Sequence, residues 1–264
     1  MSFSKLSWFM RGAACKILSR LPLTPARREE LLRLYKQVHD LEDSTGAYAA
    51  QTQDSFAKQW RDLRSGKFLL SDPWFKDNVS RILAEEEILL PQAWFKGKTV
   101  LDAGCGNGRW AYGFAKLGAD VTCVDVSEDA LRETESALLE FSSPKEFVRS
   151  PLEDLDDKMP PERLFDLVFS WGVLHHCRSF NKALKAVASH VKTGGILYLY
   201  LYGRESKSLE QDLRLFGERL RYNSLKTEKE RYCFLMEKAM GDETQLHNYH
   251  DIYAPLINRR FEFV

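Results

Sequence analysis

The chain has 264 residues, of which 44% are hydrophobic and 29% are charged, a composition that suits a folded globular protein with a sizeable core. Lysine plus arginine equals aspartate plus glutamate at 38 each, so the zero formal charge provides no basis for bulk electrostatic capture of nucleic acid. No apolar run approaches the ~20 residues that a membrane-spanning helix needs, and five widely spaced cysteines without a CxxC pair favour reduced thiols in a cytoplasmic protein.

The first 28 residues carry basic side chains among apolar ones and contain no acidic residue. Such a sequence predicts an amphipathic helix, for which two locations are open. Residues 1–20 could lie on a membrane surface, which would make the protein peripheral to a membrane, or the helix could pack over the main domain as a lid. A cleaved secretory signal fits poorly, because Arg11 and Lys16 interrupt the apolar stretch.

Residues 1–95 are predicted to form a helical arm or lid. Apolar residues recur at helical spacing over 26–43, and residues 76–90 look helical until Pro91 ends the pattern. Between them lie a polar stretch, 44–55, and an aromatic-rich stretch without clear periodicity, to which the sequence assigns no element.

From Lys98 onward strands and helices alternate. Predicted helices cover 108–118, 127–143 and 181–195, and predicted strands cover 98–104, 120–126, 146–152, 164–173 and 195–203. Such alternation favours an α/β fold with a doubly wound, mostly parallel sheet, which we assign to residues 96–203.

Residues 204–264 are predicted to form a helical segment on the substrate side of the sheet, followed by the beginning of a last strand. Apolar residues at helical spacing mark a helix within 208–240, and 257–264 resembles a strand that starts and then stops. We therefore expect the C-terminal strands to be incomplete in this chain, or a homo-oligomer or partner to complete the edge of the sheet.

A glycine-rich turn, "VLDAGCGNGRW", joins the first predicted strand to its helix. Gly104, Gly106 and Gly108 allow a ligand to approach the main chain closely, and the helix that follows points unpaired N–H groups at it. Asp125 ends the second strand, where a carboxylate can accept hydrogen bonds from a ribose diol. The combination predicts an adenosine-containing cofactor, although the turn could be purely structural and Asp125 could simply cap a helix. A dinucleotide fingerprint would need glycine at position 109, which is arginine.

This turn resembles motif I of the class I S-adenosylmethionine-dependent methyltransferases, usually written D-x-G-x-G-x-G, with Asp102 as the acidic residue. Further matches follow in the family's order within residues 98–203: Asp125, "SPLEDL", "FDLVFSWGVLHH" and "GGILYLYLY". The resemblance implies a Rossmann-like fold, S-adenosyl-L-methionine as cofactor and S-adenosyl-L-homocysteine as product.

The resemblance also implies roles for individual residues. Asp102 would lie near the cofactor's ammonium group, Asp125 would hold the ribose, and Trp171 would be either a cofactor wall or core packing. Pro151 occupies a position where the family often has an aspartate that binds the adenine amino group, so Glu153 or a main-chain carbonyl must replace it. The implied cofactor-binding residues are Asp102, Gly104, Cys105, Gly106, Asn107, Asp125, Val126, Leu152, Glu153, Ser170 and Trp171.

Methyl transfer by in-line displacement needs an aligned nucleophile and little else, because the sulfonium methyl group is already activated. A base is required only if the nucleophile must lose a proton. His175 and His176, just after strand four, are the candidate catalytic residues. Hydrogen bonding that merely fixes the loop is the alternative for His175.

Segments outside the sheet would build the acceptor pocket. Phe56 and Trp60 in "SFAKQW", together with His247, Tyr249 and His250 in "HNYHDIYAP", are the candidate substrate-binding residues. They suggest a small, partly apolar acceptor with an oxygen, carbon or nitrogen nucleophile, such as a lipid-linked, quinone-like or glycan-derived molecule. Neither a metal nor a nucleic acid partner is expected, since no concentrated basic face flanks the site.

Two other functions remain open at this point. A cofactor-binding subunit without methyl transfer could use the same fold and present its N-terminal helices to a partner. An NAD(P)-dependent oxidoreductase would also need a glycine turn and a ribose-binding acid.

Overall fold

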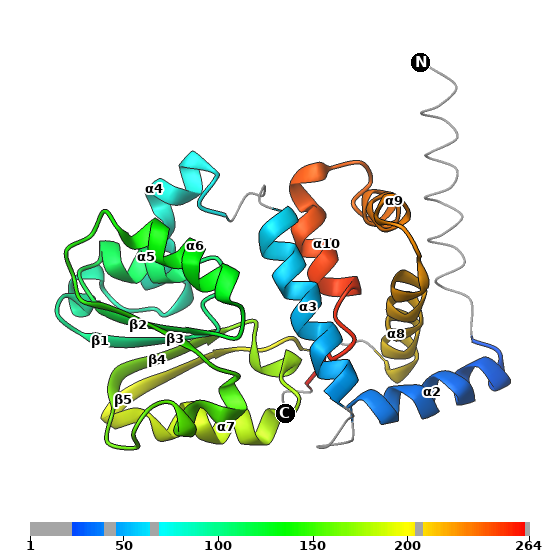
Figure 1. The fold of residues 1–264 in the computed structure, drawn as a ribbon, viewed down its shortest axis with the longest axis horizontal. Helices are drawn as coiled ribbons and strands as arrows, with labels where there is room; N and C mark the ends of the chain where they lie inside the picture. Colours follow the sequence, from blue (N-terminus) through cyan, green and yellow to red (C-terminus); the bar gives the residue numbers. More distant parts are fainter. Residues whose placement is uncertain (1–22, 40–45, 64–68, 204–207, 262–264) are drawn as a thin grey trace, which may run out of the picture.

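The computed structural model describes residues 23–39, 46–63, 69–203 and 208–261. It shows an α/β part and a helical part, with α3 (Gly46–Asp62) between them (Figure 1). The amphipathic helix predicted for residues 1–20, for which a membrane surface and a lid were both open, lies outside the described residues, as do the last three residues of the predicted final strand.

Five parallel strands form one sheet in the order β3-β2-β1-β4-β5, which confirms the predicted doubly wound fold. Because all strands run the same way, their carboxyl ends meet at one edge, where ligands bind in such sheets. The strands are β1 (Thr99–Ala103), β2 (Asp120–Asp125), β3 (Lys145–Arg149), β4 (Phe165–Trp171) and β5 (Val191–Tyr200).

Strand β5 begins at Val191 and not at the predicted 195, because residues that the sequence assigned to the end of a helix over 181–195 already pair with β4. Helix α7 (Phe180–Ser189) stops before His190, and Val191 pairs with Phe165 across an irregularity in the register. A Cβ atom at Gly195 would lie 3.1 Å from the Phe165 and Asp166 carbonyl oxygens. Glycine therefore serves close strand approach here rather than helix termination.

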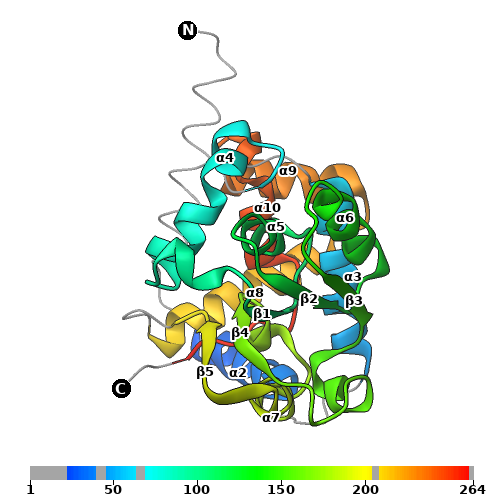
Figure 2. The same cartoon turned by 90° about the vertical axis from the view of Figure 1, so that its left-hand side faces the viewer.

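Helices cover both faces of the sheet (Figure 2). On one face Phe75, Val79 and Leu83 pack with Phe114 and Phe169, whereas α7 covers the other face. The segment 73–95, expected in the N-terminal arm, thus contributes to the core of the sheet. The helices on the first face are α4 (Pro73–Arg81), its continuation η1 (Ile82–Glu87), α5 (Arg109–Lys116) and α6 (Glu128–Leu138).

The helical part combines segments from both ends of the chain. Helix α2 (Pro25–His39) packs against α8 (Leu209–Ser224) through Leu31 and Phe216. Further along lie α9 (Glu228–Lys238), which a Thr227 capping box begins, and α10 (Leu246–Tyr253), which packs against α3, α8 and α9.

Helix α3 includes most of the polar stretch to which the sequence assigned no element. Its Thr52, Ser55 and Gln59 are buried, so the helix has a polar rather than an apolar inner face. The Gln51 and Thr52 side chains accept hydrogen bonds from the Leu256 and Ile257 amides, at 3.0 and 3.1 Å. Buried polar groups need such partners, and this requirement explains why hydrophobic periodicity missed the helix.

The C-terminal segment lies at the edge of the sheet where the strands have their carboxyl ends. Arg259 N donates to the His175 carbonyl and Phe261 N to the Tyr202 carbonyl, both at 3.0 Å. Within the described residues, the strand predicted from 257 is limited to one parallel bridge between Gly203 and Phe261.

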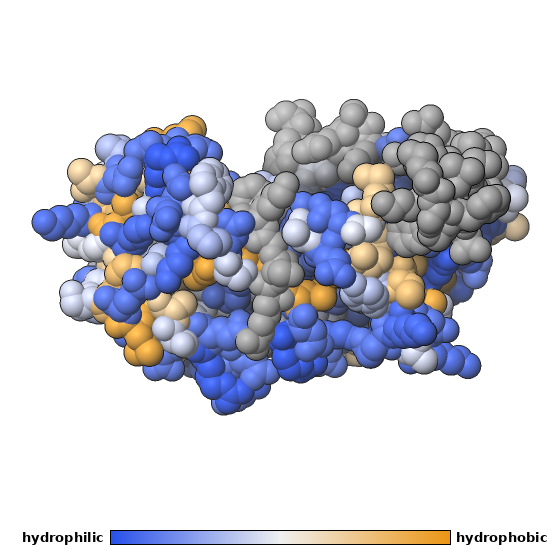
Figure 3. All heavy atoms as spheres, turned by 90° about the horizontal axis from the view of Figure 1, so that it is seen from above, coloured by the Kyte–Doolittle hydropathy of each residue, from blue (hydrophilic) through white to orange (hydrophobic). Residues whose placement is uncertain are grey.

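Among the described residues, none of the helices is long and apolar enough to cross a membrane. The face seen in Figure 3 is mostly hydrophilic, with smaller hydrophobic areas between the polar ones.

Candidate functional site

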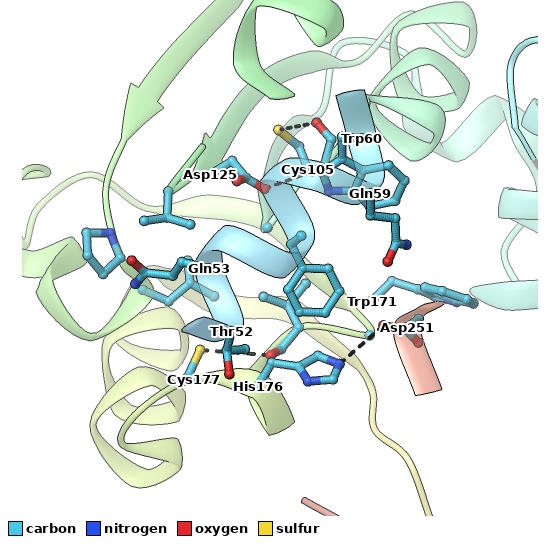
Figure 4. Close-up of a pocket in the computed structure, with 18 of the residues that line it drawn as sticks. Thr52, Gln53, Gln59, Trp60, Cys105, Asp125, Trp171, His176, Cys177 and Asp251 are labelled. Carbon is cyan, nitrogen blue, oxygen red and sulfur yellow. Dashed lines mark hydrogen bonds and ion pairs between the residues drawn. The ribbon is translucent and has the colours of Figure 1, made fainter. Parts of the chain in front are cut away.

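A pocket of about 1200 Å³, counting the space at its open mouth, lies between the carboxyl ends of the strands and helices α3 and α10 (Figure 4). Its walls come from the α3 face, the glycine turn, the ends of β2 and β4, the turns after β3 and β5, and α10. It therefore joins the α/β part to both segments that the sequence assigned to the acceptor.

The glycine turn has the close main-chain approach that its sequence predicts. Gly104, Gly106 and Gly108 have φ angles of +92°, +54° and +82°, in the left-handed region that favours glycine. A Cβ atom at Gly104 would collide with Val173, and one at Gly106 would lie 2.9 Å from the Trp60 ring. A Cβ atom at Gly108 would lie 2.8 Å from Thr134 of α6. The glycines therefore let the turn pack closely against neighbouring side chains, while Gly104 and Gly106 line the pocket with main chain.

Asp125 lies against this turn at the end of β2. Its carboxylate oxygens accept from Gly106 N at 2.9 Å and from Ser127 N at 2.8 Å. Burial raises the pKa of Asp125, while these backbone N–H groups oppose the shift. Each oxygen can still accept a further hydrogen bond. Asp125 thus helps to begin α6 and also lines the pocket.

Two buried acceptors next to the turn have no hydrogen-bond partner, the Asp102 Oδ2 and the Asn107 Oδ1. Burial, with the Asp125 charge as a second cause, raises the pKa of Asp102 to about 7. Asn107 lines the pocket, whereas Asp102 is buried and does not. Unpaired buried acceptors are costly, so the pocket wall at Asn107 suits a ligand with a donor group.

Another part of the pocket is lined by the turn after β3, through Pro151, Leu152 and Glu153, and by Val126, which follows β2. Glu153 Oε1 accepts from Ser179 N at 3.1 Å, so this carboxylate already helps to begin α7. Pro151 supplies no side-chain acceptor. The aspartate that the family often uses at this position to bind the adenine amino group therefore has no side-chain counterpart at position 151.

At the end of β4, Trp171 lines the pocket and Ser170 does not. Ser170 Oγ donates to the Ala103 carbonyl at 2.9 Å and is buried between strands. The Trp171 ring stacks on Tyr200 with centroids 4.4 Å apart, and the Arg109 guanidinium lies 4.3 Å from the Trp171 centroid. Trp171 is therefore both packed and exposed to the pocket.

The two adjacent histidines after β4 have different environments. His176 lines the pocket, while His175 is fully buried, is not part of the lining, and packs against Tyr202 with ring centroids 4.0 Å apart. Burial lowers the pKa of His175 well below its usual value. Only His176 is placed to meet a ligand in this pocket.

Some of the candidate substrate-binding residues of α3 and α10 line the pocket and others do not. Phe56, Trp60 and His247 line the pocket. His250 instead pairs through Nδ1 with Gln59 Oε1 at 2.9 Å, and Tyr249 stacks on Tyr253. Burial lowers the pKa of His247 to about 4, which keeps this ring neutral near pH 7.

Sequence reasoning did not select Asp251, Tyr202 or Arg109, which also line the pocket. Asp251 lies four residues after His247 on α10, so helical spacing alone could have placed both on one face. Tyr202 follows β5 and contacts Asp251 only through the tertiary fold, which leaves no local signal.

Comparison with known proteins gives a consistent result. A family model described as "Methyltransferase domain" matches residues 75–252. A ubiquinone biosynthesis O-methyltransferase of Dechloromonas aromatica is 38% identical over 112 residues, covering 42% of this chain and 47% of that protein. Its counterpart from Photorhabdus laumondii is 30% identical over 155 residues, covering 59% of this chain and 61% of that protein. The chain thus spans about half the length of the curated relatives it matches.

Among solved structures, a magnesium protoporphyrin IX methyltransferase of Synechocystis with bound S-adenosylhomocysteine has a TM-score of 0.42 and 21% identity. That match covers 55% of this chain and 68% of the other.

Proposed function

Because the chain belongs to the class I S-adenosylmethionine-dependent methyltransferases, we propose that it transfers the methyl group of this cofactor to a small, partly apolar acceptor. The observation that carries the proposal is the convergence of the glycine turn, Asn107 and Asp125 on one pocket, with Asp102 buried in β1 just before the turn. The turn is the ligand cradle, and the two carboxylates provide acceptors for an ammonium group and for a ribose.

The residues fit the cofactor along the length of the pocket. Asp102 and Asn107, with their unpartnered buried acceptors, would hold the amino-acid end. Asp125 would accept from the ribose hydroxyls, and Val126 and Leu152 would pack against the adenine. The remaining implied cofactor contacts are Gly104, Cys105, Gly106, Glu153 and Trp171, whereas Ser170 would act only through the strand end.

The acceptor would occupy the side of the pocket formed by α3 and α10. Phe56, Trp60 and Trp171 offer apolar surface there, and His176, His247 and Asp251 offer polar groups. When bound, S-adenosylmethionine supplies an electrophilic methyl group, and the protein's task is to align the acceptor with it and exclude water. The names of the relatives support an oxygen acceptor on a quinone-like molecule.

Calorimetry with S-adenosylhomocysteine tests the cofactor site. Burial raises the pKa of Asp102 to about 7, so part of the protein carries this proton at pH 7. An ammonium group beside this carboxyl favours the ionised form, so binding should release a fraction of a proton at that pH. The release is measured from the apparent enthalpy in two buffers of different ionisation enthalpy, and Asp102→Asn should abolish it.

Affinity for the same ligand provides a second readout. Asp125→Asn should weaken S-adenosylhomocysteine binding about 10- to 100-fold, as expected when hydrogen bonds to a charged group are lost. Asp156→Asn, at an exposed site away from the pocket, is the matched control. A protein stabilised by NAD(H) and not by S-adenosylhomocysteine would overturn the proposal. Binding without transfer of labelled methyl to any compound of a cell extract would favour a non-catalytic subunit.

A further inference from the structure

The indole ring of Trp171, at the end of β4, is held at its nitrogen by a carboxylate that lies outside the pocket lining. Trp171 Nε1 donates to Glu87 Oε2 at 3.2 Å, and the Tyr198 hydroxyl donates to the same oxygen at 2.7 Å. Trp171 lines the pocket, whereas Glu87 and Tyr198 do not. Two donors thus converge on one carboxylate oxygen behind the pocket wall.

The plane of the Trp171 ring is also fixed by two neighbours. Tyr200, which pairs with Trp171 in the β4–β5 ladder, stacks on it with centroids 4.4 Å apart and planes 8° apart. The Arg109 guanidinium at the start of α5 lies 4.3 Å from the ring centroid. Because β5 and β1 flank β4, Tyr200 approaches the ring from the β5 side, and Arg109, which follows β1, from the other side. The ring is therefore held at its nitrogen edge and on its faces.

Glu87 also contributes to the charge balance of Arg109. The guanidinium lines the pocket, and burial lowers its pKa, while the neighbouring Tyr202, Asp251 and Glu87 oppose this shift. A cation removed from water is stable only near groups of opposite charge. Glu87 therefore stabilises the cation that stacks on the indole ring as well as the ring itself.

An irregular helix brings Glu87 to this position. Helix α4 continues as the π-helix η1, in which Ile88 N donates to the Leu83 carbonyl five residues back. The extra residue in a π-turn rotates the side chains after it by about 100° relative to a regular α-helix. Leu89, which is 75% exposed, then has a φ angle of +60°, in the left-handed region that favours glycine. Such backbone irregularity is frequent at functional sites.

We propose that Glu87 is a positioning residue of the pocket, which fixes the plane of Trp171 and so the wall against which the acceptor lies. This inference rests on the proposed function, because it assigns the Trp171 wall to the acceptor. Glu87 acts through the indole ring and through the Arg109 guanidinium stacked on it. Since Glu87 supplies orientation and no reacting group, its loss should affect acceptor binding more than the chemical step.

The chain offers matched variants for this position. Glu87→Leu removes both hydrogen bonds, whereas Glu87→Gln keeps an acceptor oxygen and removes the charge. Glu85 is exposed on the same π-helix and accepts from Gln92 at 2.8 Å, so Glu85→Leu controls for the loss of a carboxylate from η1. Tyr198→Phe removes the other donor to Glu87 and leaves the Trp171 bond in place.

The first experiment observes the indole N–H directly and needs no acceptor. In protein labelled with ¹⁵N-tryptophan and saturated with S-adenosylhomocysteine, the Trp171 signal is assigned by its loss in Trp171→Phe. In Glu87→Leu this signal should move upfield in the proton dimension, and its exchange with water should become at least about tenfold faster, because the hydrogen bond is lost. Neither Glu85→Leu nor Tyr198→Phe should move it upfield.

This readout separates the inference from the function on which it rests. An indole signal that keeps its position and exchange rate in Glu87→Leu would overturn the inference and leave the methyltransferase function standing. If Glu87→Leu does not fold, Glu87→Gln decides, because a neutral acceptor is weaker than a charged one and should still shift the signal upfield; no shift there would equally overturn the inference. Failure of the wild type to bind S-adenosylhomocysteine would overturn the proposed function, while the unliganded protein still reports the Trp171 bond.

The second experiment asks whether this wall serves the acceptor. Transfer of labelled methyl from saturating S-adenosylmethionine is measured over a dilution series of one cell extract, which gives a half-saturating amount of extract and a maximal rate. Glu87→Leu should raise the half-saturating amount about 3- to 10-fold, the equivalent of one hydrogen bond. The maximal rate and S-adenosylhomocysteine affinity should stay within about threefold, and Glu85→Leu should match the wild type.

An unchanged half-saturating amount in Glu87→Leu would contradict a role of Glu87 in the acceptor wall, whatever the indole signal does. No labelled product from the wild type would overturn the proposed function and, with it, the assignment of this wall to the acceptor.

Discussion

Two histidine–aspartate pairs in this chain share a hydrogen-bond pattern and differ in everything around it. In the pocket pair, His176 and Asp251, and in the remote pair, His190 and Asp156, Nδ1 meets a carbonyl and Nε2 lies 3.5 Å from a carboxylate. The Asp251 side chain is 15% exposed, whereas that of Asp156 is 54% exposed. Solvent screens the second carboxylate, so its attraction for a charged ring is small.

The position of each pair in the sheet explains the rest of the difference. His190 lies beside the start of β4, where its carbonyl accepts from Phe165 N. His176 follows the end of β4, at the edge where the glycine turn and Asp125 also lie. The same local pattern thus lies outside the pocket at one edge of the parallel sheet and lines the pocket at the other, where ligands bind in such sheets.

The largest expected contrast is in the rate of methyl transfer after removing each carboxylate. Asp251→Asn should lower the rate about 10- to 100-fold, because the pocket loses a charged group whose hydrogen bonds are worth roughly 1.5–3 kcal/mol. Asp156→Asn should leave it unchanged. Single-turnover measurements with saturating S-adenosylmethionine compare the two. Equal rates in both variants would show that the pocket pair is structural too.

The next largest contrast between the His176–Asp251 and His190–Asp156 pairs is expected in the free energy of unfolding after each aspartate is replaced. Asp251→Asn should lower the free energy of unfolding at pH 7 by about 1–3 kcal/mol, since a buried acceptor is lost, whereas Asp156→Asn should change it by less than about 0.5 kcal/mol. The folded pKa of Asp251 lies below its unfolded value of about 3.9. Its contribution is therefore complete above that pH and lost as pH falls through the folded pKa.

Urea unfolding at a series of pH values measures this linkage. The difference between the wild type and Asp251→Asn should be constant from pH 5 to 7 and should shrink below about pH 4. A difference that grew on acidification would mean that the Asp251 pKa is raised in the folded protein, contrary to its contacts with His176 and Tyr202.

The smallest expected effect comes from the Tyr202 hydroxyl. Burial and the Asp251 charge raise the pKa of Tyr202 well above its usual value, so the phenol stays a donor at all working pH values. Tyr202→Phe should lower the transfer rate severalfold and stability by about 0.5–1.5 kcal/mol, the worth of one hydrogen bond. Tyr198→Phe, which loses a 2.7 Å bond to Glu87 outside the pocket, should lower stability but not the rate.

Sequence reasoning predicted the sheet and the glycine turn because both depend on local order along the chain. Strands β1 to β5 alternate with helices, and Gly104 to Gly108 follow a strand directly. It gave both His175 and His176 as candidates and favoured His175, whereas the pocket is lined by His176, because the register of one 3-10 turn decides which ring enters it. The assembly of Asp251, Tyr202 and Ile257 around that ring depends on contacts between distant segments, for which one sequence holds no signal.

The peptide group at Ile257 joins two parts of the site that otherwise lie on separate segments. Its N–H donates to Thr52 of α3, and its carbonyl receives the His176 ring. Helix α3 also carries Trp60, whose ring rests against Gly106 of the cofactor turn. A movement of α3 away from this turn would therefore also disturb the hydrogen bond between Thr52 and Ile257, and with it the peptide group that contacts the His176 ring. The cofactor turn and the His176 ring are thus both held through contacts with the same helix.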